Sequence, residues 1–209
     1  MRQRHWMMTP TRDAWNRLMY QRPELAGEPL VATWAEWGFP LVLRRPLPGD
    51  APGEWPLGLP LPPSQGKRRI ALTLAEQDIL RMAPPLGLAD AVATAPDEWQ
   101  QTIRSLLGLD AATRCFGSLA WQHMTGLAYL SPTSDLDLLW DLPADPRRLL
   151  AGIDAIARTA PMRIDGEVMG AHGAVQWREL RDSVDSIVVK DEAAVALMPK
   201  DAFLAGACP

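Results

Sequence analysis

The sequence has few cysteines and histidines, no long apolar run and no excess of basic residues. Its two cysteines, Cys115 and Cys208, lie far apart in 209 residues, so we expect no disulfide framework and a reducing cytoplasm. The three histidines have no zinc-like spacing. No segment reaches the roughly 18 apolar residues of a membrane helix, and the N-terminal MRQRHWMMTP has no apolar run typical of a signal peptide. With a net charge of −4 and a pI of about 5.4, the chain is not a basic nucleic-acid binder. We therefore expect a cytoplasmic protein that binds neither nucleic acid nor membrane.

The chain is rich in proline and has enough apolar residues for a packed core. Hydrophobic residues make up 47% of it, which is ordinary for a globular protein. Most of the twenty prolines precede residue 100, and this bias predicts short strands and turns in the first half. We predict a small β-rich α+β domain over residues 1–82, a linker at Met82–Pro85, and a second domain over residues 83–209.

Apolar spacing predicts the elements of both domains. In the first domain we expect helices over Thr11–Tyr20 and Leu30–Trp37, strands over residues 40–45 and Ile70–Leu74, and a turn-rich stretch over Pro46–Pro63. In the second we expect helices over Leu86–Thr94, Pro96–Leu107, Leu119–Thr125 and Ala193–Met198, a helix opening at Asp145–Pro146, and strands over Ser134–Leu139, Met162–Val168, Gly173–Leu180 and Ser186–Lys190. Trp121, Trp140 and Trp177 are expected in the core rather than as stacking platforms.

The predicted strand Ser134–Leu139 carries two aspartates at alternate positions. Side chains alternate along a strand, so Asp135 and Asp137 share one face and the intervening leucine points to the other. Paired carboxylates repel each other unless they are solvated or share a cation. Oxygen ligands of this kind suit Mg²⁺ that also binds a substrate phosphate. An acidic strand end that simply faces water is the alternative interpretation.

A Gly-Ser pair precedes the acidic strand. Gly117 can take backbone angles denied to other residues, and Ser118 lies at the start of a predicted helix, where free N–H groups favour anions. A Gly-Ser pair followed by Asp-x-Asp resembles the signature of the DNA polymerase β-type nucleotidyltransferase superfamily. The sixteen residues between the two parts, Leu119–Ser134, exceed the spacing expected for most of that superfamily.

Longer strings resemble one family in particular. They are GSLAWQHMTGLAYLSPTSDLDLLWDL from Gly117, RIDGEV from Arg163, VQWREL from Val175, VVK from Val188, FPLVLRRP from Phe39 and LGLPLP from Leu57. They resemble the malonate decarboxylase holo-acyl-carrier-protein synthases, also called phosphoribosyl-dephospho-CoA transferases. The resemblance spans most of the chain, and the long spacing is part of the family pattern.

The resemblance implies a fold, a reaction and a cofactor. The fold would be α+β, with a small β-rich N-terminal domain and a nucleotidyltransferase-like palm whose mixed sheet is flanked by helices. The enzyme would move a phosphoribosyl-dephospho-CoA group from 2′-(5″-triphosphoribosyl)-3′-dephospho-CoA to a serine of the apo acyl-carrier subunit of malonate decarboxylase, and release pyrophosphate. Mg²⁺ would be the cofactor, bound by Asp135 and Asp137, while Gly117 and Ser118 would hold the triphosphate.

A third carboxylate normally completes such a site. Asp165 and Glu167 share a face of the predicted strand Met162–Val168. The resemblance favours Asp165, also as a metal ligand, then Glu167, with Glu179 a more distant choice. This carboxylate would act as general base or orient the acceptor hydroxyl. The alternative is a tight turn centred on Asp165-Gly166.

Several basic residues could bind phosphate or an acidic carrier. Arg45 and Lys190 lie within the family-like strings and are the preferred donor contacts. The clusters at residues 44–45 and 67–69 could dock an acidic carrier protein. For each of these residues, a solvated surface charge is the alternative.

Two other functions stay open at this point. One is a nucleotidyltransferase that uses an ordinary NTP on a small molecule or protein. The other is a non-catalytic binding module with the same fold, which the intact Gly-Ser and Asp-x-Asp sequences argue against.

Overall fold

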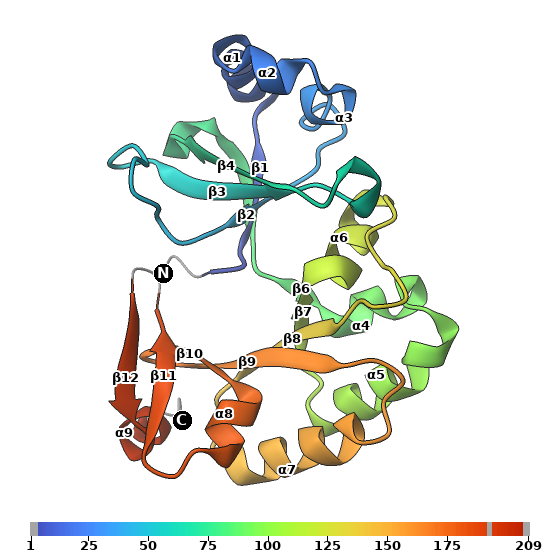
Figure 1. Cartoon of the computed structure of the whole chain (residues 1–209), viewed down its shortest axis with the longest axis vertical. Coiled ribbons are helices and arrows are strands. Elements are labelled where there is room, and N and C mark those ends of the chain that lie inside the picture. Colours follow the sequence, from blue (N-terminus) through green and yellow to red (C-terminus); the bar gives the residue numbers. More distant parts are fainter. Residues whose placement is uncertain (1–3, 192–193, 207–209) are drawn as a thin grey trace. The chain divides into compact units, whose positions relative to one another are not determined.

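The N-terminal half forms a five-stranded antiparallel sheet, and buried apolar residues alternate along three of its strands (Figure 1). The computed structural model describes residues 4–191 and 194–206, and the chain divides into two units, Met1–Pro85 and Leu86–Pro209. The first sheet has the order β4-β3-β2-β1-β5. Its strands are β1 Met7–Pro10, β2 Leu41–Leu43, β3 Trp55–Pro60, β4 Arg69–Leu74 and β5 Ile79–Ala83.

Three helices accompany this sheet: α1 Arg12–Gln21, α2 Pro23–Ala26 and α3 Pro29–Ala32. Helix α1 confirms the predicted helix over Thr11–Tyr20, and the Thr11 hydroxyl caps it by accepting from the Ala14 N–H at 3.2 Å. The predicted helix over Leu30–Trp37 is shortened to α3 followed by turns. Short 3₁₀ turns at Pro63–Gln65 and Glu76–Asp78 flank β4.

Strand β3 lies inside the stretch that was predicted to be rich in turns, where no strand was expected. Trp55, Leu57 and Leu59 alternate as buried residues, but the prolines between them concealed the strand. The Pro56 carbonyl accepts from the Arg44 N–H at 2.9 Å, so the backbone polar groups of Pro56 face β2. Pro60 lies four residues further along the same strand, and its nitrogen therefore faces the same side. Both lie beyond the ends of that three-residue strand, so no ladder hydrogen bond is lost.

The first half of the predicted linker at Met82–Pro85 belongs to a strand. Strand β5 continues through Ala83 and pairs with β1, with Met82 opposite Met8. The division between the two units follows Pro85, whereas the predicted boundary followed residue 82.

The C-terminal unit contains a seven-stranded mixed sheet in the order β12-β11-β10-β9-β8-β7-β6. Its strands are β6 Leu86–Gly87, β7 Arg114–Phe116, β8 Leu136–Asp141, β9 Ile164–Gly170, β10 Gly173–Gln176, β11 Ser186–Lys190 and β12 Val195–Pro199. Strands β8 and β9 pair in parallel, and the other neighbouring pairs are antiparallel. Two sheets with accompanying helices confirm the predicted α+β class.

Helices cover one face of this sheet (Figure 1). They are α4 Leu88–Ala91, with a 3₁₀ turn at Val92–Thr94, α5 Asp97–Leu109, α6 Gly117–Thr125, α7 Pro146–Ala157, α8 Trp177–Asp182 and α9 Lys200–Ala205. Helix α7 connects the two parallel strands, as a parallel crossover requires. It opens as predicted: Pro146 is its first residue, and the Asp145 carboxylate accepts from the Arg148 N–H at 3.1 Å.

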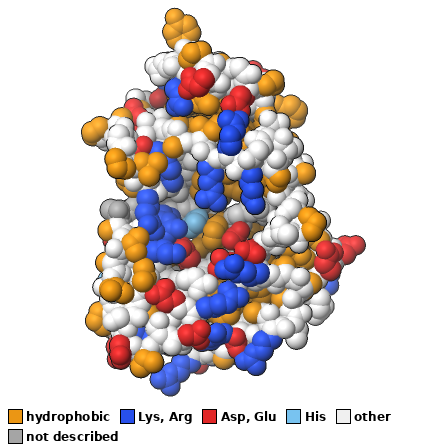
Figure 2. All heavy atoms as spheres, viewed as in Figure 1, with side chains coloured by type: hydrophobic (Ala, Val, Ile, Leu, Met, Phe, Trp, Pro, Cys, Tyr) orange, Lys and Arg blue, Asp and Glu red, His pale blue; other side chains and the backbone are white. Residues whose placement is uncertain are grey.

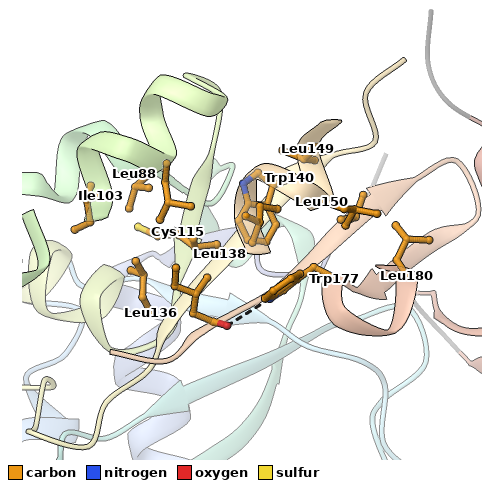
Figure 3. Close-up of a cluster of buried hydrophobic side chains, with 14 of the residues drawn as sticks. Leu88, Ile103, Cys115, Leu136, Leu138, Trp140, Leu149, Leu150, Trp177 and Leu180 are labelled. Atoms are coloured by element: carbon orange, nitrogen blue, oxygen red, sulfur yellow. Dashed lines mark hydrogen bonds between the residues drawn. The ribbon is translucent and has the colours of Figure 1, made fainter. Parts of the chain in front are cut away.

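The core of this unit lies between the sheet and the helices. Leu136, Leu138 and Trp140 point from β8 into it, and Trp177 packs nearby with its indole N–H donating to the Ile164 carbonyl at 3.3 Å (Figure 3). The tryptophans of the sequence strings are therefore core residues, as predicted. At Gly166 a Cβ atom would lie 2.6 Å from the Trp140 ring and 2.5 Å from the Leu138 carbonyl oxygen, so this strand position has no space for a side chain.

Three predicted elements of this unit differ from the structure. The helix predicted over Leu86–Thr94 begins only at Leu88, because Leu86 and Gly87 form strand β6. The strand predicted over Gly173–Leu180 ends at Gln176, because the Gln176 side chain accepts the N–H groups of Arg178 and Glu179 and so caps α8. The helix predicted over Ala193–Met198 is strand β12, which pairs along the whole of β11; Ala193 and Cys208 lie outside the described residues.

The described parts of the chain contain no helix long and apolar enough to cross a bilayer. On the face drawn in Figure 2, acidic and basic side chains lie close to one another, and apolar side chains are scattered among them.

Candidate active site

Asp137 and Asp165 lie opposite each other on the two parallel strands. The register of β8 and β9 pairs these two residues directly. Leu136 and Leu138 are fully buried on the core face of β8, so strand alternation places Asp137 on the opposite face. Asp135 immediately precedes β8. The sheet thus gathers carboxylates from two separate segments on its polar face.

Gly117 lies against the Asp137 carboxylate. Strand β7 pairs Phe116 with Asp137, and the next residue, Gly117, begins α6 with a φ of +66°. A Cβ atom there would lie 1.9 Å from Asp137 Oδ2, so only glycine fits at this position. Ser118 is the second residue of the helix, and no side-chain cap covers the helix start. Anions favour such a helix start.

Arg163 spans two of these carboxylates. Its Nη1 lies 3.7 Å from Asp135 Oδ2 and its Nη2 lies 3.6 Å from Asp165 Oδ2. The Arg163 side chain is 61% exposed. Arg163 was not among the predicted site residues, and only its place in the RIDGEV string, two residues before Asp165, could have drawn attention to it.

Gln176 holds the other oxygen of Asp165. Its Nε2 donates to Asp165 Oδ1 at 3.0 Å, and the Gly166 N–H donates to the same oxygen at 2.9 Å. The second oxygen, Asp165 Oδ2, faces Arg163 Nη2 at 3.6 Å. Sequence reasoning missed Gln176 because it was placed within a longer strand.

Glu167 and Lys190 lie on the same face of the sheet and pair with each other. Glu167 is 7% exposed, and Lys190 Nζ donates to its Oε1 at 3.2 Å. Glu179 lies on α8, where its Oε1 accepts from the Val188 N–H at 2.6 Å. Of the three candidates for the third carboxylate, Asp165 is the one opposite Asp137.

The basic candidates of the N-terminal unit differ in their surroundings. Arg44 makes a two-pronged ion pair with Asp50, with nitrogen–oxygen distances of 2.8 and 2.7 Å. Arg45 is partly buried, and its Nε has no hydrogen-bond partner among the described residues. Arg68 pairs with Glu28.

Cys115 lies on β7 beneath the carboxylates but is not suited to act as a nucleophile. Burial, reinforced by the charges of Asp90 and Asp137, raises the pKa of its thiol to about 12. The thiol therefore stays protonated at neutral pH, and the thiolate is the nucleophilic form.

The donor chemistry of the site fits a divalent cation. Within residues 4–191 and 194–206, no three His, Cys, Asp or Glu side chains form a ready metal-binding cluster. However, the guanidinium of Arg163 already spans Asp135 and Asp165 as a cation would. Hard carboxylate oxygens are the ligands that Mg²⁺ prefers, and Asp135, Asp137 and Asp165 could supply them.

Comparison with known protein families covers both units. Residues 87–201 match the "Phosphoribosyl-dephospho-CoA transferase MdcG C-terminal domain", and residues 3–85 match the corresponding N-terminal domain. These matches define the chain as an enzyme, a transferase of the nucleotidyltransferase type.

Individual relatives agree with the family models. A phosphoribosyl-dephospho-CoA transferase of Bradyrhizobium diazoefficiens is 40% identical over 98% of this chain and 93% of its own length. One from Xanthomonas campestris pv. campestris is 36% identical over 87% of this chain and 88% of its own length. The chain belongs to the phosphoribosyl-dephospho-CoA transferase family, which confirms the resemblance seen in the sequence. No solved structure gives a significant match.

Proposed function

We propose that this enzyme transfers a phosphoribosyl-dephospho-CoA group from 2′-(5″-triphosphoribosyl)-3′-dephospho-CoA to a serine of an apo acyl-carrier protein, with release of pyrophosphate. The acceptor is the carrier subunit of malonate decarboxylase, and the reaction takes place in the cytoplasm. The family match over both units supports the donor. The observation that carries the chemistry is the direct pairing of Asp137 with Asp165 next to Gly117.

Asp135, Asp137 and Asp165 would hold Mg²⁺ in this proposal. When bound, the ion would neutralise the triphosphate and lower the pKa of an attacking hydroxyl. Gly117 lets a phosphate approach the backbone, and Ser118 offers a hydroxyl at the helix start. The chain's own contribution is to position the groups for in-line attack at the α-phosphorus.

Asp165 would orient the serine of the carrier. Its Oδ1 already accepts from Gln176 and Gly166, so Oδ2 is the oxygen that receives the hydroxyl proton or the metal. Glu167 is the second candidate for this role, although it is held by Lys190. Arg45 and Lys190 are the proposed cationic contacts to the donor. Lys67 and Arg69, both exposed, would face the acidic carrier.

An intact-mass assay tests this proposal. Apo carrier subunit, the triphosphoribosyl donor, Mg²⁺ and the enzyme are mixed, and the carrier mass is followed. We expect a gain equal to the phosphoribosyl-dephospho-CoA group, which is lost in Asp137→Asn. The matched control is Asp141→Asn, an exposed aspartate at the far end of the same strand, which should stay active. A carrier left unmodified by folded wild-type enzyme contradicts the proposal, and modification with ATP as donor would favour an ordinary nucleotidyltransferase.

A further inference from the structure

The Arg163 guanidinium occupies a position where a metal ion would be expected. It lies within 4 Å of carboxylate oxygens on two separate segments, Asp135 before β8 and Asp165 on β9. Two carboxylates that share a site repel each other, and an intervening cation relieves that repulsion. Arg163 provides a positive charge between these two carboxylates.

The guanidinium is held loosely, although its backbone is fixed. Both nitrogen–oxygen distances, 3.7 and 3.6 Å, exceed hydrogen-bond length, and the side chain is 61% exposed. By contrast, the Arg163 carbonyl accepts from the Leu136 N–H at 2.9 Å in the sheet ladder. The side chain can therefore change partners while its attachment point stays next to the site. An exposed ion pair of this kind contributes little to stability.

A divalent cation and the guanidinium cannot both occupy this position. Two positive charges a few ångströms apart repel each other, and the divalent ion binds oxygen ligands at shorter distances. Once displaced, a guanidinium beside the site finds its best new partner in phosphate oxygens, which it binds in a two-pronged geometry.

We propose that Arg163 exchanges partners during the reaction: it neutralises Asp135 and Asp165 before metal binding, and it binds the triphosphate of the donor afterwards. This inference rests on the proposed function, because it requires a metal site at these carboxylates and a polyphosphate substrate. It makes Arg163 a competitor of the metal and a partner of the donor. Removing the charge of Arg163 should therefore strengthen binding of the metal and weaken binding of the donor triphosphate.

Two binding measurements test this exchange without relying on activity. Mn²⁺ binding is followed by electron paramagnetic resonance, and binding of the preformed magnesium–tripolyphosphate complex is followed by calorimetry. In Arg163→Gln we expect Mn²⁺ to bind about 3- to 10-fold more tightly, since a like charge has been removed. We expect the tripolyphosphate complex to bind about 5- to 20-fold more weakly, since a charged two-pronged contact has been lost. In both measurements the affinity of Arg163→Lys should lie between those of wild type and Arg163→Gln.

Arg158→Gln is the matched control. Arg158 is an exposed arginine of the same unit, paired with Asp154, and its loss should change neither affinity. Unchanged or weakened Mn²⁺ binding in Arg163→Gln overturns the inference, and so does an unchanged affinity for the tripolyphosphate complex. If wild-type enzyme shows no Mn²⁺ binding that depends on Asp137, the proposed function fails as well. If wild-type enzyme binds Mn²⁺ and modifies the carrier while Arg163→Gln behaves identically, the Arg163 inference alone fails.

Discussion

Gln176 is oriented toward Asp165 by the start of helix α8. Its Oε1 accepts from the Arg178 and Glu179 N–H groups at 2.6 and 3.0 Å, which leaves Nε2 to donate to Asp165 Oδ1. The amide cannot flip without losing all three hydrogen bonds. One side chain thus caps a helix and fixes a candidate catalytic carboxylate.

Two substitutions of Gln176 should separate these roles. Gln176→Glu keeps an acceptor for the helix N–H groups but loses the donor, so we expect transfer to fall about 10- to 100-fold with little change in stability. Gln176→Ala loses both functions and should also lower the free energy of unfolding by about 1 kcal/mol. Transfer rates come from the intact-mass assay and stabilities from urea unfolding. Equal activity of Gln176→Glu and wild type would show that the Asp165 contact is dispensable.

The choice of third carboxylate can be tested by paired amide substitutions. Asp165→Asn should reduce transfer by about 1,000-fold or more, because it removes a charge aimed at the reacting groups. Glu179→Gln should stay within about 3-fold of wild type, because the amide oxygen can still accept from the Val188 N–H. Single-turnover rates give both values. A Glu179→Gln variant that is folded but inactive would indicate that Glu179 on α8, and not Asp165, is the third carboxylate.

Gly117→Ala should displace the Asp137 carboxylate. The added methyl group would lie within 2 Å of Asp137 Oδ2 in a left-handed backbone conformation. We expect at least about a 100-fold loss of transfer and a stability cost of about 1–3 kcal/mol. Gly126→Ala is the control, because Gly126 has a φ of +70° with nothing within 4 Å of its Cβ position. It should lose about 1 kcal/mol of stability and keep its activity.

The ion pair between Arg44 and Asp50 should make stability depend on pH. Hydrogen bonds from the Arg44 guanidinium, with a further one from the Leu47 N–H, lower the pKa of Asp50 from 3.8 to about 2. Because the folded-state pKa is below the unfolded value, this stabilisation is present above about pH 4 and is lost as the pH falls toward 2. Asp50→Asn should cost about 1–2 kcal/mol at pH 7, and the difference from wild type should shrink on acidification.

Urea unfolding between pH 2 and pH 7 measures this effect. Arg44→Gln should remove the same pH-dependent part of the stability, and the double variant should show no further pH-dependent loss. If the free energies of unfolding of Asp50→Asn and wild type differ by the same amount throughout this pH range, the pH dependence does not come from Asp50.

Local sequence signals were sufficient for several elements of the palm. Alternation along the acidic strand predicted that the leucines and the aspartates lie on opposite faces, and the structure buries Leu136 and Leu138 in the core. The Asp-Pro dipeptide at residues 145–146 marked the start of α7, because capping depends on neighbouring residues alone. The family resemblance rested on long continuous strings, and the comparisons confirmed it.

Long-range contacts account for the differences between the predicted and the observed structure. Strand β3 is stable despite its prolines because its partner β2 is short, and β12 is a strand because β11 lies beside it. The sequence did not show that Gln176 ends β10 by capping a helix. It also did not show that Arg163 reaches Asp135, since those residues are adjacent only after β8 and β9 have paired. Such facts depend on tertiary register, which local propensity does not encode.

Gly166 links the core of the C-terminal unit to the spacing of its carboxylates. The Trp140 ring packs where a side chain of residue 166 would stand, and the neighbouring residue in the chain is Asp165. Any larger residue there would push β9 away from β8 and move Asp165 away from Asp137, without touching either carboxylate. Substitutions in the hydrophobic interior can therefore change the spacing of the candidate catalytic carboxylates without altering any of them.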